Sequence, residues 1–220
     1  RPFARKYGPW ALVTGASDGI GHAFAVELAQ RGVNVVLVAR RQPQLEQLAT
    51  LLTVAHGVQC QVVVANLSHP EGVQQVLAAT AALDVGLVVC AAGFGTSGPF
   101  LKNDLPTELD MLQVNCGALT ALSWGMGQRL VQRGRGGLVL LSSVVAFQGV
   151  ARSAHYAATK AYVQTLSEGL REEWSGLGVH VLAVAPGPVR SGFAARSQMR
   201  MAQAEDPRVV ARASLDALGH

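Results

Sequence analysis

The chain has 220 residues, of which 50% are hydrophobic and 15% charged, and it carries a net charge of +4. This length allows one substantial core but not two ordinary domains, so we predict a single domain over residues 1–220. The hydrophobic content excludes a disordered chain. Because the arginines are scattered, without a basic run or interleaved aromatic residues, no nucleic-acid partner is expected.

Cys60, Cys90 and Cys116 stand far apart, and no CxxC pair or Cys/His cluster accompanies them. The sequence therefore predicts neither a disulfide framework nor a metal site, and it favours a reducing, cytoplasmic location. No transmembrane segment is predicted, because long uncharged stretches such as Met111–Gln128 contain polar residues and Gly. The first residues lack the features of a secretory signal. Since they do not begin with Met, we expect the natural N-terminus to lie upstream.

Short apolar runs alternate with longer, helix-like stretches along the chain. Six runs rich in Val and Leu have the pattern of strands buried on both faces. They are Trp10–Thr14, Asn34–Ala39, Cys60–Ala65, Val85–Cys90, Leu138–Ser142 and Val179–Ala185. The helical stretches lie near 20–31, 43–55, 70–82, 105–133, 156–176 and 207–218. This alternation predicts an α/β fold, a Rossmann-like doubly wound parallel sheet with helices on both faces.

The segment TGASDGIG, residues 14–21, separates the first predicted strand from the first predicted helix. Its glycines follow a GxxxGxG spacing, a variant of the dinucleotide fingerprint. Glycine permits a tight turn and close approach of phosphate, and the helix N-terminus supplies free N–H groups and a partial positive charge. For Asp18 we favour helix capping, because a carboxylate repels phosphate. The cofactor-binding residues predicted here are Gly15, Ser17, Asp18, Gly19, Ile20 and Gly21.

The end of the second strand indicates which dinucleotide is bound. Folds that bind NAD place an acid about 20 residues after the glycines, whereas an Arg there accommodates the 2′-phosphate of NADP. The segment reads NVVLVARR, with Arg40 and Arg41 in this position and no acid before Glu46. The alternative is two solvated arginines at a strand end. We predict NADP(H) as the cofactor.

The segment HYAATK, residues 155–160, places Tyr156 and Lys160 at positions i and i+4, on one face of a helix. The chain thus contains, in order, the glycine turn, Asn115 in LQVNCG, Ser143 in LLSS and the Tyr156/Lys160 pair. This ordered set of motifs resembles the short-chain dehydrogenase/reductase family. The resemblance extends from Trp10 to His220. The opening YGPWALVTGASDGIG is similar to the branch that contains 17β-hydroxysteroid dehydrogenases and long-chain 3-ketoacyl reductases.

The resemblance implies a role for each catalytic residue. Tyr156 would be the acid that protonates the developing alkoxide. Lys160 would lower the pKa of the Tyr156 phenol, which is ordinarily about 10. Lys160 would also hold the nicotinamide ribose. Ser143, thirteen residues before Tyr156, is preferred over Ser142 as the hydrogen-bond donor to the substrate oxygen. Asn115 would orient a water that links Lys160 to solvent.

The resemblance also assigns cofactor residues after the later strands, and here the chain departs from the family pattern. Where the family has NNAG, this chain has CAAG, which lacks the Asn side-chain amides that tie the strand ends together. The backbone of Cys90, Ala91 and Gly93 would still contact the cofactor. The family's acid after the third strand is replaced by Asn66, whose carbonyl oxygen would bind the adenine amine. The remaining assigned cofactor residues are Leu67, Pro186, Gly187, Val189 and Ser191.

The C-terminal part corresponds to the family's variable substrate-binding loop, over about 190–206. Its Phe193, Met199 and Met201 suggest an apolar binding face, although helix packing explains them equally well. The family continues to a seventh strand, so we expect the C-terminus to be truncated.

These features predict an NADP(H)-dependent oxidoreductase that interconverts a ketone or aldehyde and an alcohol, with a small hydrophobic substrate. The alternative is a non-catalytic NADP-binding regulatory protein of the same fold, and an epimerase or dehydratase is a third interpretation. The helices near 105–133 and 156–176 match the pair that forms the family's symmetric interface. A homodimer or homotetramer is therefore expected.

Overall fold

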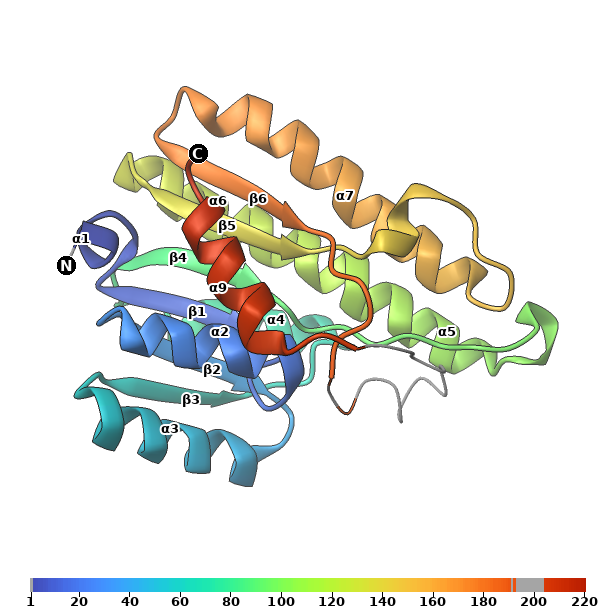
Figure 1. The fold of residues 1–220 in the computed structure, drawn as a ribbon, viewed down its shortest axis with the longest axis horizontal. Helices are drawn as coiled ribbons and strands as arrows, with labels where there is room; N and C mark the ends of the chain where they lie inside the picture. Colours follow the sequence, from blue (N-terminus) through green and yellow to red (C-terminus); the bar gives the residue numbers. More distant parts are fainter. Residues whose placement is uncertain (1, 191, 193–203) are drawn as a thin grey trace.

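The structure is a computed structural model that describes residues 2–190, 192 and 204–220. Six parallel strands form one sheet in the order β3-β2-β1-β4-β5-β6, and their arrowheads point toward the same end of the molecule (Figure 1). The strands are β1 (Trp10–Thr14), β2 (Asn34–Ala39), β3 (Cys60–Val64), β4 (Val85–Cys90), β5 (Gly136–Leu141) and β6 (Val179–Val184). The predicted Rossmann-like doubly wound fold is confirmed.

The helices connect these strands and cover both faces of the sheet (Figure 1). They are α1 (Pro2–Tyr7), α2 (Gly19–Gln30), α3 (Gln42–His56), α4 (Pro70–Ala79), α5 (Leu105–Leu112), α6 (Leu119–Arg133), α7 (Ala154–Ser175) and α9 (Pro207–Ala217). Short 3-10 turns span Phe100–Lys102 and Val144–Phe147. Within the described ranges, no helix has both the length and the apolar character that crossing a membrane requires.

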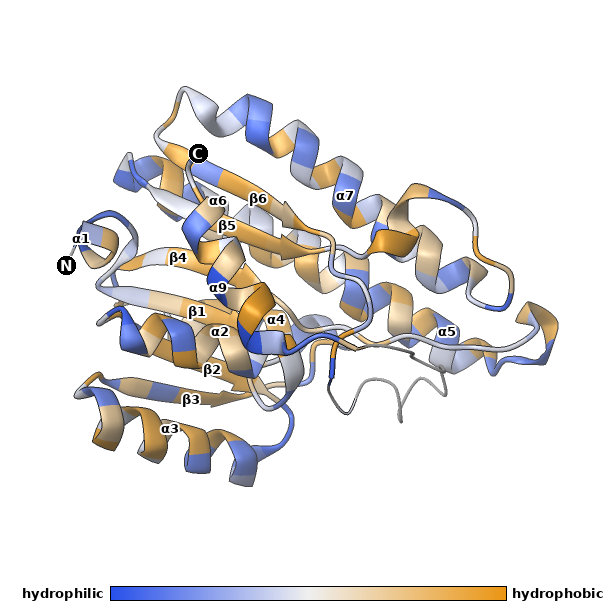
Figure 2. Ribbon diagram, in the orientation of Figure 1, coloured by the Kyte–Doolittle hydropathy of each residue, from blue (hydrophilic) through white to orange (hydrophobic). Residues whose placement is uncertain are grey.

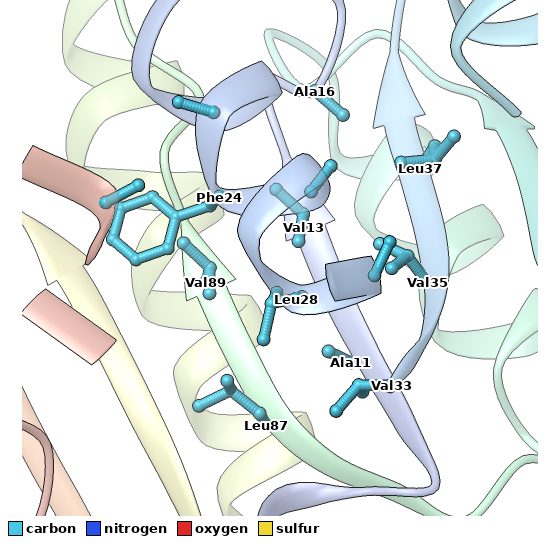
Figure 3. Close-up of a cluster of buried hydrophobic side chains, with 14 of the residues drawn as sticks. Ala11, Val13, Ala16, Phe24, Leu28, Val33, Val35, Leu37, Leu87 and Val89 are labelled. Carbon is cyan, nitrogen blue, oxygen red and sulfur yellow. The ribbon is translucent and has the colours of Figure 1, made fainter. Parts of the chain in front are cut away.

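Alternate strand residues supply two separate cores, because successive side chains point to opposite faces of the sheet. On one face, Val13, Leu37 and Val89 pack in a cluster with Phe24 and Leu28 of α2 (Figure 3). On the other face, a second cluster joins the strands to α4, α6 and α7. Burial on both faces explains why the strands are almost continuously hydrophobic (Figure 2).

Two features differ from the sequence prediction. The helix expected over 105–133 is interrupted by a π-helical turn, Gln113–Ala118, which contains Asn115. The short helix α1 was not predicted, and long-range contacts hold it. The Tyr7 hydroxyl donates to the carbonyl oxygen of Leu218 (3.0 Å) and hydrogen-bonds His180 Nδ1 (2.8 Å).

The strand order determines where a ligand site forms. The chain leaves β1 in one direction to form β2 and β3, and in the other direction to form β4, β5 and β6. The crevice between β1 and β4 at their carboxyl ends is therefore the topological switch point, where open α/β sheets bind ligands.

Candidate active site

A cavity of about 840 Å³ lies at the carboxyl ends of the strands. It is lined by these residues of the predicted site: Gly15, Ser17, Asp18, Gly19, Ile20, Gly21, Arg40, Arg41, Asn66, Leu67, Ala91, Gly93, Ser143, Tyr156, Lys160, Pro186, Gly187 and Val189. Cys90 and Asn115 are buried and do not line it. Ser191 lies outside the described residues. The structure thus brings both the glycine turn and the Tyr/Lys pair to one cavity.

The glycine turn lies directly against the end of β4. Gly15 has a φ of 70°, and a Cβ built on it would lie 2.9 Å from the carbonyl oxygen of Ala91. No other residue type fits there without a backbone shift, because real Cβ atoms do not approach so closely and the left-handed φ favours glycine. Asp18 occupies the N-cap position of α2 but makes no side-chain capping bond. Its Oδ2 accepts from the N–H of Gly192 (3.1 Å), so the predicted capping is wrong.

Thr14, at the end of β1, ties the two central strands together. Its hydroxyl oxygen accepts from the N–H of Ala91 (3.1 Å) and of Ala92 (3.0 Å). This contact joins the strand ends without side-chain amides, which the CAAG segment lacks. Cys90 is paired within the sheet to Thr14 and Leu140 and is 3% exposed. Thr14 was not among the predicted site residues, although a hydroxyl residue at a buried strand end beside the glycine turn was a visible signal.

Arg41 reaches back to the glycine turn. Its Nη2 donates to Ser17 Oγ (3.0 Å) and lies 3.9 Å from Asp18 Oδ2. The guanidinium group of Arg41 is therefore beside the glycine turn, and the preference for NADP(H) stays a prediction.

Asn66 is engaged in a local turn after β3. Its Oδ1 accepts from both the backbone N–H (3.2 Å) and the hydroxyl (3.0 Å) of Ser68. Asn66 lines the cavity, but the carbonyl oxygen assigned to adenine already accepts two protein hydrogen bonds. Its contact with adenine stays a prediction.

Tyr156 and Lys160 lie on one face of α7, both buried. Burial raises the pKa of Tyr156 to about 12, although a hydrogen bond with the Ser143 side chain opposes the rise. Burial also lowers the pKa of Lys160 to about 8, and the Cys116 thiol partly offsets this effect. Lys160 Nζ donates to the carbonyl oxygen of Leu141 (2.8 Å). The expected lowering of the phenol pKa by Lys160 is not found in the protein alone, because desolvation of the phenolate dominates.

Asn115 lies behind the cavity, in the π-helical turn. Its Oδ1 accepts from the N–H of Phe94 (3.1 Å), and its Nδ2 donates to the carbonyl oxygen of Phe94 (2.9 Å) and to Thr159 Oγ1 (3.0 Å). A Cβ on Gly93 would lie 2.9 Å from Asn115 Oδ1, so glycine is needed for this approach. The side chain of Asn115 therefore joins the segment after β4 to α7.

Residues 9–202 match the short chain dehydrogenase family. The chain belongs to this family. It is 34% identical over 185 residues to a 7β-hydroxysteroid dehydrogenase of Clostridium sardiniense, covering 84% of this chain and 71% of the relative. It is 33% identical to a very-long-chain 3-oxoacyl-CoA reductase of Anas platyrhynchos, over 81% of this chain but only 59% of the relative. The predicted relation to the hydroxysteroid and ketoacyl reductase branch is confirmed.

A solved structure also resembles this one. A short-chain dehydrogenase from Sphingobium yanoikuyae, in complex with NADPH, has a TM-score of 0.90 and 33% identity. The alignment covers 94% of this chain and 83% of that one.

Further residues also line the cavity. The apolar ones include Phe94, Val114, Val144, Val145 and Val150, and the polar or charged ones include Ser97, Asp110, Arg152 and Ser153. Sequence analysis assigned none of them, because they come from loops and helical turns whose placement depends on the whole fold. The predicted substrate loop falls mainly on residues 191 and 193–203, outside the described residues, together with Phe193, Met199 and Met201. Backbone hydrogen bonds join the flanking residues: Arg190 N–H to Glu205 (2.8 Å) and Glu205 N–H to Pro188 (2.8 Å).

Proposed function

We propose that the protein is an NADP(H)-dependent oxidoreductase that interconverts a ketone or aldehyde and an alcohol. One observation carries the proposal: Ser143, Tyr156 and Lys160 line the same cavity as the glycine turn and Arg41. The proposed proton donor, Tyr156, thus lines the same cavity as the proposed dinucleotide site. The regulatory alternative is not favoured, because such a protein has no need for a buried Tyr beside a Lys and a Ser.

The residues at the β1–β4 crevice fit a dinucleotide phosphate. The turn at Gly15 leaves no room for a side chain, and α2 directs its first N–H groups toward the cavity end of the sheet. Arg41 adds a cation beside Ser17, which supports NADP(H) over NAD(H). The NADPH complex of the similar Sphingobium yanoikuyae enzyme supports the same choice. The bound cofactor supplies or accepts the hydride.

The protein's own contribution is to place a proton. The phenol of Tyr156, with its pKa raised to about 12, stays protonated at neutral pH and donates its proton to the carbonyl oxygen of the substrate. The Ser143 hydroxyl, which lies beside Tyr156, turns its one O–H to the substrate oxygen and donates a second hydrogen bond there. The Lys160 ammonium stabilises the phenolate that remains. Asn115 fixes the segment after β4 against α7.

The apolar side chains among the lining residues of the cavity support a small hydrophobic carbonyl compound or alcohol as the substrate. The names of the two relatives, a hydroxysteroid dehydrogenase and a 3-oxoacyl-CoA reductase, likewise favour a hydrophobic substrate. The chain spans 71% and 59% of the lengths of these two relatives, so we propose this activity for the whole protein. We further propose that residues 1–220 form one domain and that the protein resides in the cytoplasm.

An NADPH-oxidation screen tests the proposal. Ketones graded by chain length and ring count are added, and absorbance at the nicotinamide band is followed. We expect turnover with hydrophobic ketones and a lower KM for NADPH than for NADH. Tight NADPH binding without turnover of any ketone, aldehyde or alcohol would instead support the regulatory alternative.

We also propose a homodimer or homotetramer formed through α5, α6 and α7. Leu105, Leu109 and Leu112 of α5 are 63%, 55% and 42% exposed, and Trp124 of α6 is 68% exposed. An exposed apolar surface of this kind marks an interaction site. Light scattering at micromolar concentration should give a multiple of the monomer mass. A stable monomer would contradict this proposal.

A further inference from the structure

The first turn of α7 carries Tyr156 but lacks a side-chain cap. Ala154 is the first helical residue, so Tyr156 is the third, and the Ser153 side chain at the N-cap makes no capping bond. The first turn also contains no acidic residue. The first N–H groups of a helix have no partner within it, and uncapped ends fray. A second contact must therefore hold the turn that positions the phenol.

Glu108 of α5 supplies such a contact. Its Oε2 lies 2.6 Å from His155 Nδ1, on the residue just before Tyr156. A carboxylate only accepts hydrogen bonds, so Nδ1–H of the imidazole is the donor. The other carboxylate oxygen accepts from Asn103 Nδ2 (2.8 Å), and the Thr96 side chain makes a further hydrogen bond.

The burial of Glu108 is unusual for a carboxylate. The residue is 2% exposed, and burying a charge is costly unless it is paired and hydrogen-bonded. Burial raises the pKa of Glu108, but the hydrogen bonds from Thr96, His155 and Asn103 outweigh it, so the pKa is lowered overall. The carboxylate is therefore ionised at neutral pH, and its charge lies near the N-terminus of α7, where a negative charge is stabilising.

Among the described residues, the side-chain hydrogen-bond partners of Glu108 come from two places, the segment after β4 and the first turn of α7. Two further contacts join the same places. The Phe100 ring packs edge-on against His155, with 6.3 Å between the ring centres. The N–H of Gly98 donates to the carbonyl oxygen of Arg152 (2.8 Å), just before α7. Neither Glu108 nor His155 lines the cavity, so neither is a wall of the site.

We propose that Glu108 and His155 are positioning residues that hold the first turn of α7 in place of the missing cap and thereby aim Tyr156. This inference rests on the proposed role of Tyr156 as proton donor. Loss of the contact leaves the phosphate-binding part of the cofactor site intact, because the glycine turn and Arg41 are elsewhere in the cavity. It reduces the fraction of molecules in which the phenol is correctly aimed.

The test compares His155→Ala with His155→Asn. Alanine removes the donor to Glu108, whereas the Asn amide nitrogen occupies nearly the position of Nδ1 and keeps it. For His155→Ala we expect kcat to fall on the order of 10-fold, since small misplacements of a reacting group are costly. KM and the NADPH Kd should stay within about twofold of the wild type. His155→Asn should keep kcat within about twofold.

Hydrogen exchange provides a readout that does not depend on activity. The N–H of Ala157, which donates to the carbonyl oxygen of Ser153 (2.8 Å), reports opening of the first turn. We expect exchange in 153–160 to quicken in His155→Ala and in Glu108→Ala but not in His155→Asn. The Glu108/His155 double variant should add little to either single change, because coupled residues act together.

The outcomes separate the two proposals. Unchanged exchange in His155→Ala, or an equal loss of kcat in His155→Asn, overturns the positioning role. If Tyr156→Phe keeps normal turnover, the proposed function fails, and the exchange data alone then decide whether Glu108 and His155 hold the turn. If Glu108→Ala does not fold, the pair of His155 variants is sufficient, because the His155 side chain is 22% exposed.

Discussion

The ammonium nitrogen of Lys160 lies 5.8 Å from the centre of the Tyr156 ring, within one buried face of α7. Burial acts on both groups in the same way, since it disfavours the phenolate and the ammonium alike. It raises the pKa of Tyr156 to about 12 and lowers that of Lys160 to about 8. Without a bound cofactor, the Tyr156 phenol is therefore protonated at neutral pH, and the pKa of the neighbouring Lys160 is close to neutral pH.

The pKa of Lys160 predicts a pH dependence of stability. The pKa falls from 10.5 to about 8 on folding, so between these values the unfolded chain binds more protons. Stability contributed by this group therefore rises with pH across that window. Relative to Lys160→Met, the wild type should gain up to about 3 kcal/mol of unfolding free energy between pH 7.5 and 10.5.

The comparison with the variant is essential, because the buried thiols of Cys90 and Cys116 have raised pKa values and act in the opposite direction. Urea denaturation at several pH values measures the difference. A constant difference between wild type and Lys160→Met would show that burial does not shift the Lys160 pKa.

Arg41 should determine the preference for NADP(H). In Arg41→Ala, the Kd of NADPH should rise about 10- to 100-fold, because a hydrogen bond to a charged group contributes about 1.5–3 kcal/mol. The Kd of NADH should change little. Arg171→Ala is the control, since Arg171 is exposed on α7 and does not line the cavity. Fluorescence titration measures both constants, and an equal loss for NADH and NADPH would refute the role.

Thr14 should contribute to stability through its two accepted hydrogen bonds. Thr14→Val removes the acceptor for the N–H groups of Ala91 and Ala92 at a residue that is 1% exposed. We expect a loss of about 1–3 kcal/mol in the free energy of unfolding, the usual cost of unsatisfied buried donors. Thr14→Ser keeps the hydroxyl and should lose much less. Equal stability of the two variants would show that the hydroxyl contact is unimportant.

Much of the fold could be predicted from local sequence, because strands buried on both faces leave continuous hydrophobic runs such as Asn34–Ala39. The glycine turn and the Tyr156/Lys160 pair were equally visible, since their function depends on short, fixed spacings. Pairing of the strands then brings these motifs to the same edge of the sheet.

Features that depend on long-range contacts could not be predicted. The π-helical turn contains Asn115, whose side chain hydrogen-bonds Phe94 and Thr159 from distant segments. The helix that ends at Tyr7 is held by Leu218 and His180. The raised pKa of Tyr156 also escaped prediction, because the sequence shows the neighbouring Lys but not the depth of burial.

Single-turnover oxidation of NADPH by Tyr156→Phe, with a ketone that the wild type reduces, tests the central claim most directly. The variant keeps the ring and removes only the hydroxyl group that donates the proton. We predict a fall in rate on the order of 10³-fold, within the range of general acid catalysis, while the NADPH Kd stays within about twofold. A rate near that of the wild type, with NADPH bound normally, would contradict the account.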